Sequence, residues 1–280
     1  MDFRKLALED KAIYERFGLG EFLGSEFNFA ITWLEDLAGE AEICDLGDMA
    51  FVRTKLNGAQ IYYPPLLKDQ GRLAEAVQML GANVDIRGLT KQQARSLGKG
   101  YRITTDRGEW DYIYCAGCLA KLEGRKYHSK RNFVRRLEKL EREFREYDEA
   151  LDKEGILELC KRWSEVHNTQ DLWWSEEQII GRALDNWREL DLKIGVLYVG
   201  GQLAGFSVNW VGQGVAHTFF EKADNRFVGA YQAINQYTAK AFFDGVKYVN
   251  RHNDMNIEGL RKSKLSYHPV MILEKYRATN

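Results

Sequence analysis

The spacing of apolar positions changes along this chain, and each spacing predicts one kind of element. Spacings of three and four residues predict amphipathic helices, whereas alternation over short runs that end at Gly or Asn predicts strands. In the first half these patterns predict helices at 8–17, 26–37, 71–80 and 91–97, and strands at 41–46, 49–56, 59–66, 84–89, 101–106 and 109–115. In the second half they predict helices at 155–168, 175–190, 229–244 and 257–264, and strands at 193–199, 202–211, 214–223, 246–250 and 269–276.

The two halves share one order of elements: two helices, three strands, a helix, a strand, a helix and a strand. Asn57-Gly58 and Gly200-Gly201 are two-residue hairpin signals between predicted strands. The shared order predicts an α/β (α+β) fold of two tandem domains, residues 1–122 and 123–280. Each domain is expected to hold a mixed, mostly antiparallel sheet flanked by helices.

The segment between the halves, "LEGRKYHSKRNFVRRLEKLEREFREYDE", predicts a basic helix that opens the second domain. Ser129 is the predicted N-cap, and one apolar face follows, with Glu138/Arg142 and Glu141/Arg145 as predicted ion pairs on the other side. The apolar face comprises Phe133, Leu137, Leu140, Phe144 and Tyr147.

The start of this helix is strongly basic, which opposes the helix dipole. Its cations are Lys121, Arg125, Lys126, Lys130, Arg131, Arg135 and Arg136, against the single acid Glu123. One interpretation is a solvated charged face. The other is a phosphate-binding patch, in which Arg131 and Arg135 contact an acidic cofactor, RNA or an anionic lipid head group.

Composition narrows the class of protein. The formal net charge is −1, 45% of residues are apolar, and no run approaches 18 consecutive apolar residues. The first residues, "MDFRKLALEDK", lack the apolar core of a signal peptide. We therefore expect a cytoplasmic protein without a membrane span, for which peripheral contact with a membrane stays open.

The cysteine and histidine patterns give little support for metal chemistry. "CAGC" at Cys115–Cys118 is read as small residues in a corner between strand and loop, with a redox pair or half a zinc site as alternatives. His217 lies among apolar residues and fits a buried histidine. His252 and Asp254 have H-x-D spacing without further ligands, so no metal site is predicted.

The junction "EKADNRFVGAYQAINQ" has the features of an anion-binding turn, because glycine at a helix start lets backbone N–H groups approach a phosphate. The spacing Arg226-x-x-Gly229-Ala230 resembles the pyrophosphate loop of GNAT acyltransferases, Q/R-x-x-G-x-G/A. The last position departs from that pattern, because it is Tyr231 here.

Longer stretches carry a second resemblance. "GRKYHSKRNFVRR", "AYQAINQ" and "YVNRHNDMNIEGLRKSKLSYHPV" are similar to the C-terminal domain family of phosphatidylglycerol lysyltransferases and its soluble relatives, and the similarity extends over nearly the whole chain. Those proteins, like the Fem-type aminoacyl transferases, have two GNAT-like domains.

The resemblance implies transfer of an acyl or aminoacyl group. Acyl-CoA or aminoacyl-tRNA would be the donor substrate, with no tightly bound cofactor. The acceptor would be an amine or hydroxyl of a small molecule or a lipid head group. The membrane-spanning half of the lipid-modifying enzymes has no counterpart in the sequence, so lipid lysylation itself is not assumed.

Such transfer needs a base and donors for a developing oxyanion. Glu221, near the end of a predicted strand, is the candidate base; the alternative is a surface carboxylate paired with Lys222. Tyr267 is the candidate proton donor to the leaving group; the alternative is a tyrosine at the edge of the core.

The polar run after residue 249 is the last candidate, because ligands of open α/β sheets collect beyond the carboxyl ends of strands. Asp254 or Asn256 can cap the following helix, and its basic end, which includes Lys264, complements the dipole. This leaves Asn250, Arg251, His252 and Asn253, which we expect to face the same cleft as Glu221.

Two other functions stay open. One is a catalytically silent protein that binds a nucleotide, RNA or an anionic lipid in the same cleft. The other is an RNA-binding module without a small-molecule site, which the near-zero net charge makes less favoured.

Overall fold

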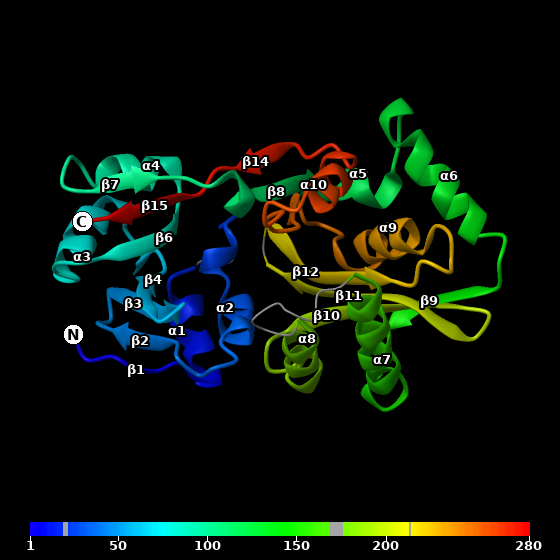
Figure 1. Ribbon diagram of the computed structural model, residues 1–280, viewed down its shortest axis with the longest axis horizontal. Helices are drawn as coiled ribbons and strands as arrows, with labels where there is room; N and C mark the ends of the chain where they lie inside the picture. Colours follow the sequence, from blue (N-terminus) through cyan, green and yellow to red (C-terminus); the bar gives the residue numbers. More distant parts are fainter. Residues whose placement is uncertain (19–21, 168–175, 213) are drawn as a thin grey trace. The chain divides into compact units, whose positions relative to one another are not determined.

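The structure is a computed structural model that describes residues 1–18, 22–167, 176–212 and 214–280 (Figure 1). The chain forms two compact units, and each unit is built from separate stretches of the sequence. The first unit comprises residues 1–113, 252–264 and 271–280, and the second comprises residues 114–251 and 265–270. Each unit has its own sheet and its own core.

The first unit contains one sheet in the order β1-β2-β3-β4-β6-β15-β7, with β5 also paired to β3. The β4–β6 pair is parallel, and the other pairs are antiparallel. Its strands are β1 Arg4–Lys5, β2 Glu42–Asp45, β3 Met49–Leu56, β4 Ala59–Tyr62, β5 Leu66–Leu67, β6 Asp85–Leu89, β7 Arg102–Thr104 and β15 Tyr276–Thr279. Its helices are α1 Lys11–Arg16, α2 Phe29–Glu35, α3 Leu73–Met79, α4 Lys91–Ser96 and, ending one residue beyond the unit, α10 Glu258–Leu265.

Local sequence explains much of this unit. Asn57 and Gly58 have φ angles of 52° and 78°, and Leu56 pairs with Ala59, so the predicted hairpin turn is confirmed. Apolar residues of α3 and α4, such as Leu73, Val77 and Ala94, pack against the sheet in one buried cluster.

In the second unit, β9 Arg142–Glu146, β10 Leu192–Val199, β11 Gln202–Val211 and β12 Val215–Ala223 are antiparallel neighbours in this order. Next to β12 lies the parallel strand β13 Tyr248–Asn250, followed by β8 Asp111–Cys115, which runs from the first unit into the second. The helices are α5 Ala116–Lys121, α6 His128–Leu137, α7 Glu149–His167, α8 Glu176–Asp185 and α9 Ala230–Phe242. Single 3-10 turns also occur along the chain, at Leu8–Asp10, Ser25–Phe27, Gln70–Arg72, Arg107–Glu109 and Arg125–Tyr127.

The second unit is layered. α9 covers one face of β10–β12, and α7 covers the opposite face (Figure 1). Ala233 and Ile234 of α9 are fully buried in a cluster with Leu197 and Ala204 of the sheet. Burial of this apolar face stabilises the unit by roughly 25 cal/mol for each Å² removed from water. It also fixes which residues of α9 face β12.

The last strands of the two halves are exchanged between the sheets. β8, predicted as the end of the first half, continues into the second unit. The C-terminal strand β15 instead pairs with β6 and β7 in the first unit. The predicted strand 269–276 is therefore wrong as one element: it is two strands, β14 Met271–Leu273 and β15, and β14 pairs with the start of β8. The predicted boundary between two repeated domains at residue 122 concerns a repeat in the sequence order, which the compact units do not test, and it stays a prediction.

The long basic helix is the main error in the predicted elements. α6 starts at His128, so Ser129 is not its N-cap, and it ends at Leu137. Of the later apolar residues, Phe144 lies in β9, which pairs with β10, whereas Leu140 precedes this strand and Tyr147 follows it. Phe144 still faces α9, with its ring centroid 5.7 Å from that of Tyr237, but it does so from a strand.

The two ion pairs predicted for the longer helix are also absent from the described residues. Arg142 donates to the backbone oxygen of Glu138, and Arg145 pairs with Asp152. Backbone hydrogen bonds to the open edge of β10 have overridden a helical pattern in this segment.

The predicted fold class is confirmed. The molecule is α/β, with two mixed, mostly antiparallel sheets flanked by helices. Among the described residues, no helix combines the length and the apolar character that a membrane span requires.

Candidate active site

The candidate base Glu221 lies near the end of β12 and points to the α9 side of the sheet. Asn235 of α9 donates to its Oε2 over 3.0 Å. Lys222 points to the other side of the strand, where its Nζ lies 2.7 Å from Glu176 and 3.3 Å from the ring centroid of Trp163. The predicted alternative, a surface pair of Glu221 with Lys222, is therefore wrong.

Arg251 is the partner of Glu221. It directly follows β13, and its Nη2 lies 2.8 Å from Glu221 Oε1, with both side chains largely buried, at 14% and 10% exposure. Burial by itself would lower the pKa of Arg251, but the charge of Glu221, together with Tyr114 and Tyr267, outweighs this effect and the pKa is raised. The expected contact between the polar run and Glu221 is thus present for Arg251.

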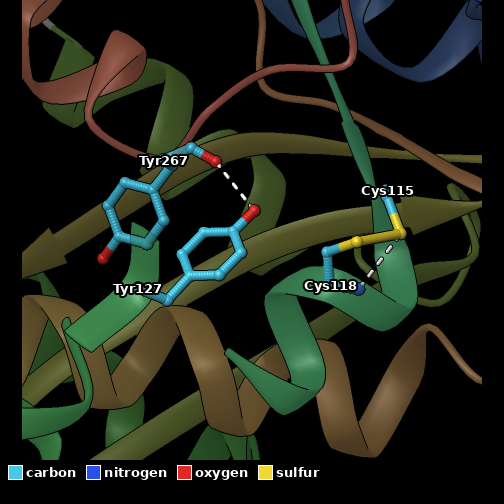
Figure 2. The surroundings of a disulfide bond; sticks show 4 residues. All are labelled: Cys115, Cys118, Tyr127 and Tyr267. Atoms are coloured by element: carbon cyan, nitrogen blue, oxygen red, sulfur yellow. Dashed lines mark hydrogen bonds between the residues drawn. A yellow bond between two sulfur atoms is a disulfide. The ribbon is translucent and has the colours of Figure 1, made fainter. Parts of the chain in front are cut away.

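The aromatic ring of Tyr267 covers the Arg251 guanidinium, at 5.1 Å from its centroid, and Tyr114 lies 5.6 Å away. Tyr267 is held through its backbone oxygen, which accepts from the Tyr127 hydroxyl over 3.1 Å, while its own hydroxyl points away (Figure 2). Burial raises the pKa of Tyr267 above its ordinary value, so this hydroxyl stays protonated and can donate.

Lys130, from the first turn of α6, completes the group. Its Nζ lies 4.1 Å from the ring centroid of Tyr267 and donates to Ser266 Oγ over 2.7 Å. Burial lowers the pKa of Lys130, and the charge of Arg251 adds to the effect. We call Glu221, Asn235, Arg251, Tyr267, Tyr114 and Lys130 the Glu221 cluster; all six belong to the second unit.

The cluster contains one carboxylate and two cations, so it has an excess of positive charge. Such a site favours an anionic group or a developing oxyanion, because the donors are already in place and partly removed from water. Glu221 can act as a base only when its lone pairs are free, and both oxygens are engaged by Arg251 and Asn235.

The turn with the Arg226-x-x-Gly229 spacing is arranged differently from a phosphate loop. Arg226 is 64% exposed and pairs with Asp224 two residues before it, at 2.6 Å. Gly229 has a φ of 99°, and a Cβ there would lie 2.2 Å from the backbone oxygen of Phe133 in α6. Glycine at this position therefore permits close packing of α6 on the start of α9, and the next residue, Ala230, is buried.

Lys264 and Asn253 belong to the first unit. Lys264 donates to the backbone oxygen of His252 over 3.1 Å, so it holds the turn before α10. Asp254 is fully buried there and accepts from Arg261 and Tyr112 over 2.8 and 2.6 Å. It also accepts the backbone N–H of Asn256 and so begins the turn that precedes the helix. Because α10 begins at Glu258, neither Asp254 nor Asn256 occupies its N-cap position, and the predicted cap is wrong. His252 also lies in the first unit, and Asn250 is buried at the end of β13.

Apart from Lys130, which belongs to the Glu221 cluster, the cations of the basic segment are one structural arginine and an exposed strip. Arg131 donates to the backbone oxygens of Leu122 and Gly124, which follow α5. Within the part of the chain that the structure describes, the other exposed cations have no carboxylate within 4 Å. We call them the basic strip: Lys121, Arg125, Lys126, Arg135 and Arg136.

The "CAGC" motif is a disulfide at the junction of β8 and α5 (Figure 2). The prediction of a corner between strand and loop is wrong, because a helix of six residues starts directly after Cys115. The backbone N–H of Cys118 donates to Cys115 Sγ over 3.2 Å. No group of three or more potential ligands for a metal occurs in the described part of the chain.

A separate hollow of about 420 Å³ lies at the start of α7 in the same unit. No member of the Glu221 cluster lines it. Its walls are Tyr147, Asp148, Glu149, Ala150, Trp187 and Arg188.

Comparison with known proteins agrees with this fold. Residues 21–279 match the family "Phosphatidylglycerol lysyltransferase, C-terminal". The chain belongs to this family. The expected relationship is thereby confirmed.

Individual relatives are distant. A protein from Bacteroides thetaiotaomicron of unknown function is 27% identical, with a TM-score of 0.87 and 99% of each chain covered. L-PGS from Bacillus licheniformis is 15% identical, with a TM-score of 0.68 and coverage of 96% and 92%. FemX is 10% identical, with a TM-score of 0.65 and coverage of 99% and 97%. The last two show that this chain shares their fold.

One curated relative is an uncharacterized protein from Mycoplasmoides gallisepticum, 22% identical over 59% of this chain. The matched region spans about half of that relative's length, 54%.

Three members of the Glu221 cluster are not predicted by the sequence patterns. In the sequence, Lys130 is one cation among several in the basic segment, and Tyr114 is one residue of a strand. Asn235 offers a usable signal: Asn235 and Gln236 are polar residues on a helix whose neighbours Ala233 and Ile234 are buried. A buried amide needs a partner, and the partner here is Glu221.

Proposed function

We propose that this protein transfers an aminoacyl group from aminoacyl-tRNA to an amine or hydroxyl acceptor, using the Glu221 cluster. Family membership supports the reaction class, since the family is named for lysyl transfer to phosphatidylglycerol. The observation that carries the proposal is the excess of buried donors around one carboxylate, next to a strip of cations without acidic partners.

In the proposed reaction the acceptor attacks the ester carbonyl of the donor. Glu221 takes the proton of the acceptor once Arg251 shifts from it toward the substrate. Arg251 and Lys130 face the developing oxyanion, and the protonated Tyr267 donates to the leaving 3′-oxygen. This division of work matches what acyl transfer requires, a base and preorganised donors.

The choice of tRNA over acyl-CoA rests on the turn before α9, which α6 and Asp224 occupy, and on the basic strip. The backbone of α6 packs against Gly229, where a pyrophosphate would otherwise approach, and Arg226 is engaged by Asp224. The basic strip instead presents five exposed cations, at Lys121, Arg125, Lys126, Arg135 and Arg136. Several separate phosphate contacts fit the backbone of an RNA better than one pyrophosphate.

The acceptor is proposed only as a class. The relatives' names point to a lipid head group, and a small-molecule amine or hydroxyl is the other source. An assay with labelled lysyl-tRNA should include phosphatidylglycerol vesicles and soluble amines in separate reactions, so that the product identifies the acceptor.

Salt dependence tests the donor. We expect the tRNA affinity to fall steeply with salt, with a slope in log Kd of roughly 0.7–0.9 for each phosphate contact. Arg135→Glu combined with Arg136→Glu should reduce this slope by about 1.4–1.8, whereas Lys193→Glu, at an exposed cation on β10, is the control. An unchanged slope in the double variant would refute the role of the strip.

A second function is favoured by one observation, the engagement of both Glu221 oxygens. A closed pair of this kind suits a protein that binds RNA without catalysis. Glu221→Gln decides between the two functions: loss of transfer with tRNA binding intact supports the enzyme. Binding without turnover in the wild type, on every donor and acceptor, supports the silent protein.

A further inference from the structure

The Cys115–Cys118 pair is the one disulfide in the described part of the chain, and it differs from the other cysteines in access. Cys44 and Cys160 are free and buried at 2% exposure each. Cys115 and Cys118 are half-buried, and Gly117 between them is exposed. A thiol reagent can therefore reach this pair while the two free thiols are covered.

The pair also lies where three elements of the Glu221 cluster meet. Cys115 follows Tyr114, whose ring faces Arg251. Ala120 of α5 accepts from Gln236, the neighbour of Asn235 on α9, over 2.9 Å.

The chain just after α5 is tied to α6. The backbone oxygens of Leu122 and Gly124 accept from Arg131, which belongs to the helix that carries Lys130 and part of the basic strip. The short helix α5 thus connects β8, α9 and α6 through direct contacts. A shift of the first turn of α5 would therefore change the positions of Tyr114, Asn235 and the basic strip.

We propose that Cys115 and Cys118 are a reversible redox pair that controls the Glu221 cluster. A dithiol reductant attacks one sulfur through its thiolate and forms a mixed disulfide; its second thiol then resolves this bond. The pair gains two electrons and two protons and becomes two thiols, while the reductant becomes a disulfide. The consequence follows from the position of the bond: reduction removes the covalent link between Cys115 at the start of α5 and Cys118 in its first turn, so this turn is no longer cross-linked.

The pair has one feature suited to this exchange. The N–H of Cys118 that donates to Cys115 Sγ in the disulfide would stabilise a thiolate there after reduction, and the thiolate is the reactive form. The oxidised form holds Tyr114 and α6 in the arrangement described above. Reduction is expected to loosen both and to weaken donor binding by about 5-fold or more. The effect on donor binding rests on the proposed function, whereas the conformational effect does not.

The experiment compares oxidised and dithiol-reduced full-length protein. Alkylation after unfolding and mass measurement count the thiols: two in the oxidised protein unfolded without reductant and four after reduction and unfolding, with the two new ones at Cys115 and Cys118. Hydrogen exchange then reports the backbone at 114–137. We expect faster exchange in this segment after reduction and unchanged exchange in α8.

Variants separate the possible outcomes. Cys115→Ser with Cys118→Ser should reproduce the reduced state without reductant, and Cys160→Ser should respond to redox like the wild type. If exchange at 114–137 is the same in both redox states, the control is refuted. If exchange differs while neither form binds tRNA, the redox pair stands and the proposed donor is refuted. If tRNA binds equally to both forms, the pair does not control donor binding.

Discussion

Substitution of Gly229 by alanine separates two meanings of the Arg226-x-x-Gly229 pattern. If the role of Gly229 is to let backbone N–H groups approach a phosphate, Gly229→Ala should leave the fold nearly intact and abolish binding of acyl-CoA. The structure gives the opposite expectation, because the missing Cβ makes room for the backbone of α6. Two separate costs follow from the φ of 99° and from the Phe133 oxygen, which lies 2.2 Å from the position that a Cβ would take.

The magnitude follows from these two costs. A left-handed conformation costs a non-glycine residue roughly 1–2 kcal/mol. The Phe133 carbonyl must also retreat by about 1 Å to reach contact distance, and overpacking of this kind costs typically about 1–3 kcal/mol. We therefore expect Gly229→Ala to lower the free energy of unfolding by about 2–5 kcal/mol.

Gly245 provides the matched control. Its φ is 74°, and a Cβ there would meet nothing within 4 Å, so Gly245→Ala should cost only the conformational part, about 1–2 kcal/mol. Urea unfolding of both variants measures the difference. Equal destabilisation by the two substitutions would refute the packing role of Gly229, and loss of acyl-CoA binding at unchanged stability would restore the phosphate interpretation.

Three further outcomes are expected. Hydrogen bonds from Arg261 and Tyr112 lower the pKa of Asp254 from 3.8 to about 2. The contribution of ionised Asp254 to folding stability is therefore present above about pH 5 and is lost as pH falls through the interval from about 4 to about 2. The stability gap between wild type and Asp254→Asn in urea should thus be about 2 kcal/mol at pH 7 and shrink toward pH 2.5; a constant gap would contradict the assignment. Lys275 is buried, and its Nζ lies 2.7 Å from Glu26 and 2.9 Å from Asp111, so Lys275→Met leaves two buried carboxylates without their cation and should lower the free energy of unfolding by about 3–5 kcal/mol. Lys262→Met, which removes an exposed pair with Glu258, should lower it by under about 1 kcal/mol. Similar losses in the two variants would show that the buried triad is not structural. Tyr267→Phe should slow the proposed transfer while tRNA affinity stays unchanged, as judged by comparing kcat with Kd, and a parallel loss of both would assign Tyr267 to binding instead.

The sequence by itself determined the elements whose signals are local. Asn57-Gly58 and Gly200-Gly201 predicted their hairpins because both residues of such turns need positive φ, and the structure has φ values of 52°, 78°, 55° and 74° there. The apolar face of α9 and the order of β10–β12 were predicted from a different local signal, the apolar spacing of elements that bury a single side. The resemblance to the family was carried by short motifs and holds over nearly the whole chain.

Tertiary structure alone decided the rest, because it depends on which edges and partners come together in space. Phe144 and Tyr147 continue a helical spacing, yet residues 142–146 form a strand because they pair with the open edge of β10. β8 and β15 exchange sheets, which no periodicity records. Glu221 could be chosen as a carboxylate at a strand end, but its partner could not, since Arg251 is 30 positions away in the chain and meets it only through the parallel pairing of β12 with β13. Sequence patterns report how each segment buries its own surface, whereas a site is made of segments that meet, and that meeting is fixed only when the sheets are formed.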